Sequence, residues 1–356
     1  MSSLITRHLA SAGFESARTL NNIPHGHSFE VLASAEIDEP STGDEWQEAV
    51  ASACAALSYS DLNKIIEQAP TDKHLIQWLH HHLSAIQLPS SLTQSMRSIS
   101  LKSAPQTYTH WTVDDSSIWL TRSYQFEAAH QLPNVPLGHK CGRMHGHGFS
   151  AAISLRGSSE VETTHPHREI DQAWTPLHEQ LHLRCLNDIP GLENPTSEHL
   201  ALWLWEALEG SLDLVAVAVN ETPTAGCVFN GQRMRIWKEQ TFDSAVMLSE
   251  APKHDPRRNK HGHTFKARLH LTGSLDEVLG WVYDYGDIKT AFSPVFDQLD
   301  HRPLYDIEGL AHADSQRLAR YIYEHMKSPL TQLSGVDVEH QTNQGVWLRE
   351  ANCFDL

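Results

Sequence analysis

Cysteine is scarce in this sequence of 356 residues, which contains five: Cys54, Cys141, Cys185, Cys227 and Cys353. Five is an odd number, and no two of them have CxxC spacing. The set therefore fits neither a disulfide framework nor a zinc knuckle made of thiolates. We expect any cysteine with a chemical role to act as a free thiol.

Long apolar runs are also missing. No run approaches the roughly 20 apolar residues that a membrane-spanning helix needs. The opening stretch, MSSLITRHLASAGFES, lacks the apolar region of a signal peptide. Hydrophobic residues make up 40% of the chain and charged residues 20%, which is typical of an ordinary globular protein. The sequence thus predicts a cytoplasmic protein with no membrane partner.

Basic residues are in deficit, with 27 Lys and Arg against 44 Asp and Glu and a formal net charge of −17. Nonspecific nucleic-acid binding normally needs a basic face, so no nucleic-acid partner is expected. An anionic substrate would need a local basic pocket. The stretch KHDPRRNK at 253–260 is either a loop that attracts phosphate or a solvated charged loop.

What the sequence does contain is one pattern repeated three times. The signature HGH, followed by Ser, Gly or Thr and then Phe, starts at His25, His145 and His261. A related stretch precedes each signature, and an amphipathic helix with a polar start follows it. The related stretches are GFESAR at 13–18, QFEAAH at 125–130 and TFDSAV at 241–246. The helices are expected from about Pro70, Pro195 and Ala313.

Each signature also opens an alternation of apolar residues, as in Phe149, Ala151 and Ile153, which predicts a strand. Each copy then reads as two strands, two helices and two strands, so the chain is predicted to be α+β. The expected domains are 1–108, a degenerate copy, 109–240, the metal-bearing copy, and 241–356.

Three histidines of the middle copy are predicted to converge on a metal. His145 and His147 project from one face of a strand, and His130 ends the strand before it. Three imidazoles leave an open position on a tetrahedral zinc ion, as a catalytic zinc needs. The alternative is that the three act separately as polar side chains. Arg18 and Val246 stand in place of His130 in the other copies, which predicts one zinc ion per chain.

The middle copy resembles the 6-carboxy-tetrahydropterin synthases of queuosine biosynthesis, which are relatives of 6-pyruvoyl-tetrahydropterin synthase. The matching stretches are 126–149, 185–208 and 221–229, and 280–304 of the third copy looks like a further fragment. The resemblance implies three tandem domains of the tunnelling fold, each an antiparallel sheet with two helices on one face. In that fold the sheets join into a barrel, and the active sites lie between neighbours.

The resemblance also implies the site residues beyond the zinc ligands. Cys141 corresponds to the family's cysteine, and either Glu221 or Glu198 to the glutamate that anchors the pterin. The family's Asp-His pair is missing from the middle copy and present in the third as Asp300 and His301. Because family sites are shared between neighbours, we predict one composite site between the second and third copies.

The implied function is that of a zinc-dependent lyase converting 7,8-dihydroneopterin triphosphate to 6-carboxy-5,6,7,8-tetrahydropterin. Cys141 is the expected general base, with nearby positive charge favouring its thiolate. His301, oriented by Asp300, would relay protons. The alternatives are a 6-pyruvoyl-tetrahydropterin synthase type of triphosphate elimination and a pterin-binding protein without turnover. If the three copies close one ring, a homodimer of two stacked rings is expected.

Overall fold

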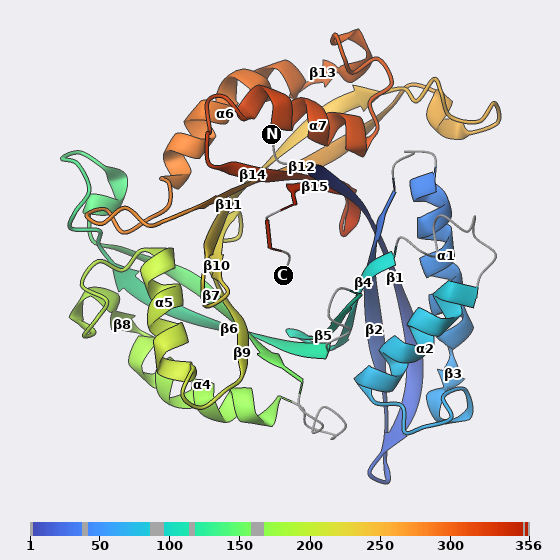
Figure 1. Ribbon diagram of the computed structural model, residues 1–356, viewed down its shortest axis with the longest axis horizontal. Coiled ribbons are helices and arrows are strands. Elements are labelled where there is room, and N and C mark those ends of the chain that lie inside the picture. Colours follow the sequence, from blue (N-terminus) through green and yellow to red (C-terminus); the bar gives the residue numbers. More distant parts are fainter. Residues whose placement is uncertain are drawn as a thin grey trace.

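The structure, a computed structural model, describes residues 3–37, 42–85, 96–113, 118–157, 167–351 and 353–354. Its main elements follow one order three times: two long strands, a helix, a two-residue strand, a second helix and two more strands (Figure 1). We call these sets the first, second and third repeats.

The first repeat consists of β1 (Leu4–Leu20), β2 (Ile23–Glu36), α1 (Thr42–Leu57), β3 (Ser60–Asp61), α2 (Asp72–Ala85), β4 (Met96–Ala104) and β5 (Thr107–Thr112). The second consists of β6 (Ile118–His130), β7 (His145–Arg156), α4 (Arg168–Leu181), β8 (Arg184–Cys185), α5 (Ser197–Leu208), β9 (Leu214–Thr222) and β10 (Ala225–Phe229). The third consists of β11 (Met234–Val246), β12 (His261–Gly273), α6 (Tyr285–Leu299), β13 (Arg302–Pro303), α7 (Ser315–Met326), β14 (Leu333–Gln341) and β15 (Gln344–Glu350).

The expected domain boundaries, after residues 108 and 240, fall inside β5 and β11. Both boundaries therefore lie within strands of the sheet, and the three repeats begin instead at β1, β6 and β11.

Twelve long strands of the described chain form one closed antiparallel barrel. Around the ring the order is β10-β9-β7-β6-β5-β4-β2-β1-β15-β14-β12-β11, and pairing of β10 with β11 closes it. The first strand of each repeat pairs with the last strand of the repeat before it in the ring. The prediction of tunnelling-fold sheets that join into a barrel is confirmed.

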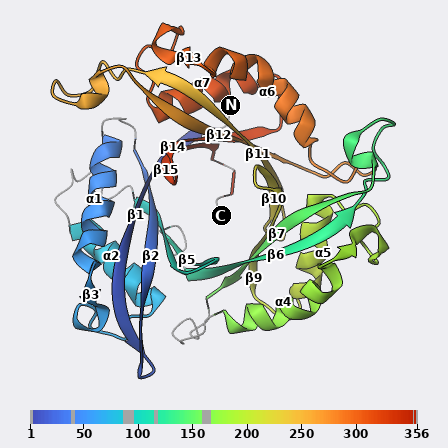
Figure 2. The same cartoon turned by 180° about the vertical axis from the view of Figure 1, so that it is seen from behind.

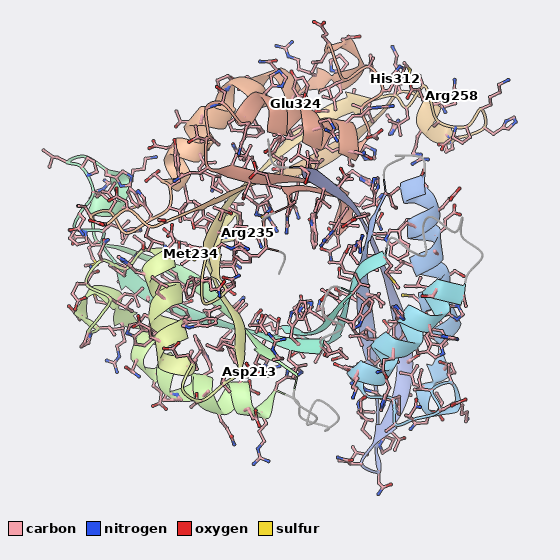
Figure 3. The ribbon with its side chains drawn as sticks, viewed as in Figure 1. Asp213, Met234, Arg235, Arg258, His312 and Glu324 are labelled. Atoms are coloured by element: carbon pink, nitrogen blue, oxygen red, sulfur yellow. The ribbon has the colours of Figure 1, made fainter. Side chains whose placement is uncertain are left out.

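All six helices of the described chain lie outside the barrel (Figures 1 and 2). Strand alternation explains this arrangement, because one face of each strand carries apolar side chains that must be covered. On β7, Phe149, Ala151 and Ile153 are buried under the helices. On β11, the neighbours Met234 and Arg235 lie on opposite faces, Met234 toward the helices and Arg235 toward the inside of the ring (Figure 3).

The second helix of each repeat begins where the sequence predicts a polar start. Thr196 caps α5 by accepting a hydrogen bond from the His199 backbone N–H at 3.1 Å, and Asp314 caps α7 by accepting one from Arg317 at 2.8 Å. Such caps satisfy backbone donors that the first turn of a helix leaves free. Among the helices of the described residues, none combines the length and the apolar character needed to cross a membrane.

The buried core is divided unequally among the repeats. The second and third repeats share one continuous cluster of buried apolar side chains, whereas the first has a cluster of its own, around Trp46 and Phe29. The faces of α5 and of the segment before α6 therefore meet within one core. This junction holds the candidate site.

Candidate metal centre and active site

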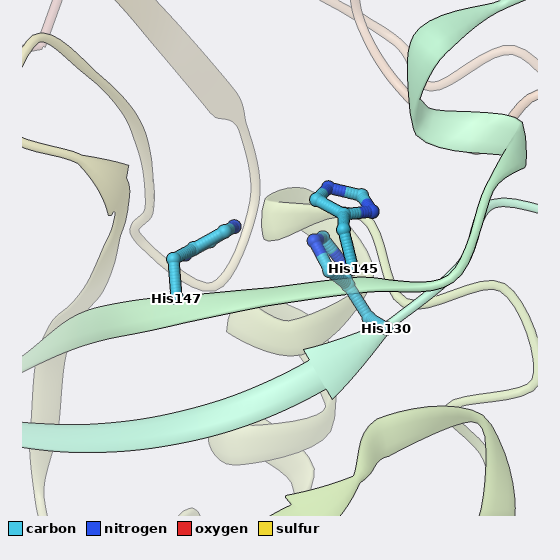
Figure 4. Close-up of side chains that lie close together, drawn as sticks. All are labelled: His130, His145 and His147. Carbon is cyan, nitrogen blue, oxygen red and sulfur yellow. The ribbon is translucent and has the colours of Figure 1, made fainter.

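Three histidines of the second repeat converge at the open end of the β6–β7 hairpin. His130 is the last residue of β6 and is paired with His145, the first residue of β7. His147 follows on the same face of β7, because side chains two apart in a strand share a face. One ligand nitrogen from each ring lies within 4.8 Å of the others (Figure 4). Within the described ranges this is the one such group of three or more potential ligands.

Hydrogen bonds fix which nitrogen each ring presents. The Nδ1 atoms of His130, His145 and His147 lie 3.1, 2.8 and 3.2 Å from the backbone oxygens of Pro195, Arg143 and Gly148 respectively. A carbonyl oxygen only accepts, so each Nδ1 carries the proton and each Nε2 keeps a lone pair. Backbone partners of this kind orient histidines that ligate metals.

The electrostatics of His130 also suit a ligand. Its side chain is buried, and its Nε2 has no hydrogen-bond partner in the described chain. Burial, with a smaller contribution from His145 and His147, lowers the pKa of His130 to about 4. The neutral imidazole that a metal needs is therefore the stable form at neutral pH. An orphaned buried nitrogen beside two further Nε2 atoms fits a divalent metal with an open coordination position.

In the first and third repeats, the position of His130 is occupied by residues that are not histidine. Arg18, paired with His25, donates from Nε to the His25 Nε2 at 3.2 Å and from Nη1 to the Asp72 carboxylate at 2.8 Å. Val246 is paired with His261 and supplies no ligand atom. Among the described residues, only the second repeat brings the ligand nitrogens of three histidines within 4.8 Å of one another.

Cys141 lies in the loop between β6 and β7, within the short 3₁₀ turn Lys140–Gly142. Burial raises the pKa of its thiol, and the nearby carboxylates of Glu221 and Asp284 raise it further. The sequence predicts instead that positive charge favours the thiolate. In the chain alone, the charged groups with the largest influence on Cys141 are acidic, so the prediction did not anticipate this environment.

The two candidate pterin anchors differ in their free hydrogen-bonding capacity. Glu198 is fully buried, and its Oε1 accepts from the Val282 backbone N–H at 3.1 Å while its Oε2 accepts from the Ser197 hydroxyl at 2.9 Å. Burial raises the pKa of Glu198 to about 7. Glu221, on β9, is partly buried, and its side chain makes no hydrogen bond or ion pair with other described residues. Its carboxylate is thus free to accept hydrogen bonds from a ligand.

Glu221 lies near His145 of the histidine group. Burial raises the pKa of its carboxyl, Asp284 adds to the increase, and His145 and Lys238 oppose it. The groups that interact with Glu221 therefore come from the second and third repeats alike, since Lys238 and Asp284 belong to the third.

The segment before α6 of the third repeat packs directly on this site. Thr196 donates to the Gly280 carbonyl at 2.7 Å, Asn194 donates to the Leu279 carbonyl at 2.8 Å, and the Ser197 and Tyr285 hydroxyls lie 2.9 Å apart. Gly280 has φ of +75°, and a Cβ there would stand 2.4 Å from the His199 ring. The close approach of the two repeats therefore requires glycine at this position.

Asp284 and His139 form a second contact across the same junction. The His139 Nε2 lies 3.0 Å from the Asp284 Oδ2, and the His139 Nδ1 accepts from the Cys141 backbone N–H at 3.2 Å. Sequence reasoning missed both residues. The only available signals were their places in the stretches that carry the family resemblance, 126–149 and 280–304.

Asp300 and His301 lie elsewhere in the third repeat, just after α6. Their side chains are 2.9 Å apart, and 77% of the His301 side chain is exposed. His301 lines an open groove that is also lined by His261 and His263 of the same repeat. No contact among the described residues joins either of them to Cys141. The structure therefore gathers His130, His145, His147, Cys141 and Glu221 but leaves this pair apart within one chain.

The basic stretch 253–260 is largely engaged in contacts of its own. Arg257 forms ion pairs with Asp255 and with Asp44 of the first repeat. Arg258 donates to the backbone carbonyls of Ser249 and Ala251. These contacts favour the interpretation of 253–260 as a charged loop without a ligand over its interpretation as a loop that attracts phosphate.

Comparison with known proteins identifies the family of the chain. The sequence model of the 6-pyruvoyl tetrahydropterin synthase family matches residues 119–232 and again residues 235–351. The chain belongs to this family, which it represents twice in tandem. The matches cover the second and third repeats.

Two kinds of synthase occur among the individual proteins that are similar to this chain. Over 128 residues the chain is 35% identical to a 6-carboxy-5,6,7,8-tetrahydropterin synthase of Synechocystis, covering 33% of this chain and 97% of that protein. It is 36% identical over 76 residues to a putative 6-pyruvoyl tetrahydrobiopterin synthase of Caenorhabditis elegans, covering 20% of this chain and 54% of that protein. A solved structure of the 6-pyruvoyl tetrahydropterin synthase of Caenorhabditis elegans matches with 25% identity and a TM-score of 0.30, covering 33% of this chain and 95% of that one.

Proposed function

We propose that this protein is a zinc-dependent lyase that converts 7,8-dihydroneopterin triphosphate to 6-carboxy-5,6,7,8-tetrahydropterin, a step toward queuosine and other 7-deazapurines. The observation that supports it most is the group of His130, His145 and His147 beside a free carboxylate, Glu221, and a thiol, Cys141. Similarity over 128 residues to a 6-carboxy-5,6,7,8-tetrahydropterin synthase, covering 97% of that protein, supports the choice of product.

The three Nε2 atoms would hold zinc, which acts as a Lewis acid toward the oxygens of the substrate side chain. Glu221 would accept two hydrogen bonds from the aminopyrimidine edge of the pterin, because both of its oxygens are free of protein donors. Glu198 would instead maintain the junction, because it already accepts from Val282 and Ser197.

Cys141 is proposed as the general base that removes a proton from the substrate side chain. A thiol whose pKa is raised needs added positive charge at the site before it ionises near neutral pH. A bound divalent cation a few residues along the chain, at His145 and His147, would supply that charge. In this arrangement the thiol is protonated in the empty site and becomes basic in the loaded one.

Asp300 and His301 are proposed to complete a site of a second chain. The β6–β7 and β11–β12 hairpin ends point away from the ring in different directions (Figure 1). His301 lies beside β11, where its backbone N–H donates to the Asp243 carbonyl at 2.6 Å. The exposure of His301 suits a contact between chains. Two stacked rings related by a two-fold axis would present each His301 to its partner, since such an axis makes contacts reciprocal.

Two alternatives to this lyase activity are each supported by a specific observation. Triphosphate elimination that leaves a pyruvoyl side chain is favoured by the family that matches the chain. Pterin binding without turnover is favoured by the separation of His301 from Cys141 and by Leu183 in the position that a relay histidine would take in the second repeat.

The test is product formation from 7,8-dihydroneopterin triphosphate by the zinc-loaded protein, followed by mass spectrometry. We expect 6-carboxy-tetrahydropterin from the wild type and none from Cys141→Ala. The matched control Cys185→Ala, a second partly buried cysteine of the same repeat, should keep the activity. A pyruvoyl product would establish the first alternative, and stoichiometric pterin binding without any product the second.

A further inference from the structure

The loop that carries Cys141 is held by its backbone at two points. The Cys141 carbonyl accepts from the Leu132 N–H at 2.8 Å, and the Cys141 N–H donates to the His139 Nδ1 at 3.2 Å. His139 is also the residue that caps the turn Lys140–Gly142. The placement of the thiol therefore depends on the orientation of the His139 ring.

The proton position on His139 follows from these contacts. Its Nδ1 accepts a backbone hydrogen bond, so the proton of the neutral ring is on Nε2. That Nε2–H points at the Asp284 Oδ2, 3.0 Å away, and both side chains are largely buried, with 27% and 16% exposed. A carboxylate bonded to one nitrogen fixes both the tautomer and the plane of the ring. Asp284 therefore determines how His139 meets Cys141.

Asp284 is itself fixed by the start of α6. Its Oδ1 accepts from the backbone N–H groups of Gly286 and Asp287 at 2.6 and 3.0 Å, which makes it the N-cap of the helix. Negative charge is favoured at this end of a helix, because the backbone donors there are otherwise free. One oxygen thus anchors the carboxylate to the third repeat, and the other reaches into the second.

Two residues close to Asp284 in the sequence also contact the second repeat. The Trp281 ring lies 5.9 Å from the His139 ring, centroid to centroid, and Gly280 packs on the start of α5. The segment 280–285 therefore contacts the second repeat at Gly280 and Trp281 as well as at Asp284.

We propose that Asp284 is a positioning residue of the third repeat for the cysteine loop of the second, acting through His139 on Cys141. It forms a continuous path of hydrogen bonds from the start of α6 to the backbone of the proposed base. The third repeat, which lacks a full set of metal ligands, thereby contributes to the site of its neighbour. Only the expected effect of Asp284 on turnover rests on the proposed function. The expected effect of Asp284 on the reactivity of the Cys141 thiol does not depend on that function.

The test is the variant Asp284→Ser, because serine keeps the helix cap and is too short to reach His139. We expect its melting temperature and zinc content to match the wild type. The rate of alkylation of Cys141 by iodoacetamide, followed on the peptide that contains it, should rise at least threefold, because the loop loosens and a nearby carboxylate is lost. If the protein is a lyase, kcat should fall at least tenfold with little change in KM.

The matched control is Asp287→Ser, which removes the same charge from the exposed side of the same helical turn. Its Cys141 should react at the wild-type rate. A Cys141 alkylation rate in Asp284→Ser within twofold of the wild type would overturn the proposal, whatever the activity. If the wild type forms no product but Asp284→Ser still exposes Cys141, the proposed function fails and the positioning role stands.

Discussion

Arg18 Nε lies 3.2 Å from His25 Nε2, and the two residues are paired on β1 and β2 as His130 and His145 are paired on β6 and β7. The guanidinium thus occupies, in the first repeat, the place where the second repeat gathers ligands for a metal. Its charge is balanced by Asp72 at 2.8 Å. A fixed side-chain cation therefore stands in the first repeat where the second repeat has His130.

This replacement predicts that the first repeat depends on the ion pair for its stability. Arg18 and Asp72 are both buried, and Asp72 also accepts from Ser103 and Thr109. Removing one partner leaves the other charge buried without compensation, which costs about 3–5 kcal/mol. Arg18→Ala should therefore lower the free energy of unfolding by about that amount in urea denaturation.

The control for Arg18→Ala is Lys64→Ala. Lys64 forms an exposed ion pair with Asp61, and exposed pairs contribute at most about 1 kcal/mol. Equal and small losses in both variants would contradict the role assigned to Arg18.

One equivalent of metal per chain is the second prediction. His130→Ala removes a ligand whose Nε2 has no other partner, so zinc content measured by mass spectrometry after dialysis should fall from about one per chain to near zero. His263→Ala, at the equivalent of His147 in the third repeat, should leave it at one. A content near two in the wild type, halved by His263→Ala, would show a second metal site.

The two glutamates should separate into a ligand-binding and a structural role. Glu221→Gln should weaken binding of a pterin at least tenfold in calorimetry, because hydrogen bonds to a charged group contribute about 1.5–3 kcal/mol. Its melting temperature should change little. Glu198→Gln should instead lower the melting temperature, since Glu198 accepts from Val282 across the junction of two repeats. The reverse result would make Glu198 the anchor.

Acid should destabilise the protein through His270. Burial lowers the pKa of His270 to about 3, below the value of about 6.5 in an unfolded chain. Only the unfolded state takes up a proton as pH falls below about 6.5, so this stabilisation is complete above that pH and is lost as pH falls toward 3. The loss approaches about 1.4 kcal/mol per pH unit.

The measurement is urea denaturation between pH 7.5 and 4.5. His270→Gln should show a flatter dependence of unfolding free energy on pH than the wild type, whatever its absolute stability. The exposed His325, replaced in the same way, serves as the control and should keep the wild-type slope. An unchanged slope in His270→Gln would show that another group carries the acid response.

Complementation tests the placement of the relay. Cys141→Ala and His301→Ala should each be inactive alone. If His301 serves the site of a partner chain, coexpression of the two variants produces heterodimers with one intact site each. Random pairing then restores about a quarter of the wild-type activity, since each heterodimer is reciprocal. Mixtures without activity, or a chain that sediments only as a monomer, would contradict the stacked dimer.

Much of the fold was predictable because it depends on short-range pattern. Alternation after each HGH signature determined which face of β7 and β12 is buried, and polar residues before the apolar helices marked the starts of α5 and α7. The convergence of His130, His145 and His147 was also accessible, because a hairpin brings together residues that are close in sequence. Recurrence of the pattern three times indicated three repeats, and the family resemblance implied that their sheets join into a barrel.

Only the tertiary structure decided how the repeats meet. The contact of Asp284 with His139, the engagement of Glu198 by Val282, and the distance of His301 from Cys141 depend on which turn of one repeat docks on its neighbour. Residues separated by more than 80 positions are brought together by packing and by a glycine that permits close approach. No periodicity within one repeat carries that information. The sequence by itself thus determined the repeats and their histidines, and packing between repeats determined the site that they share.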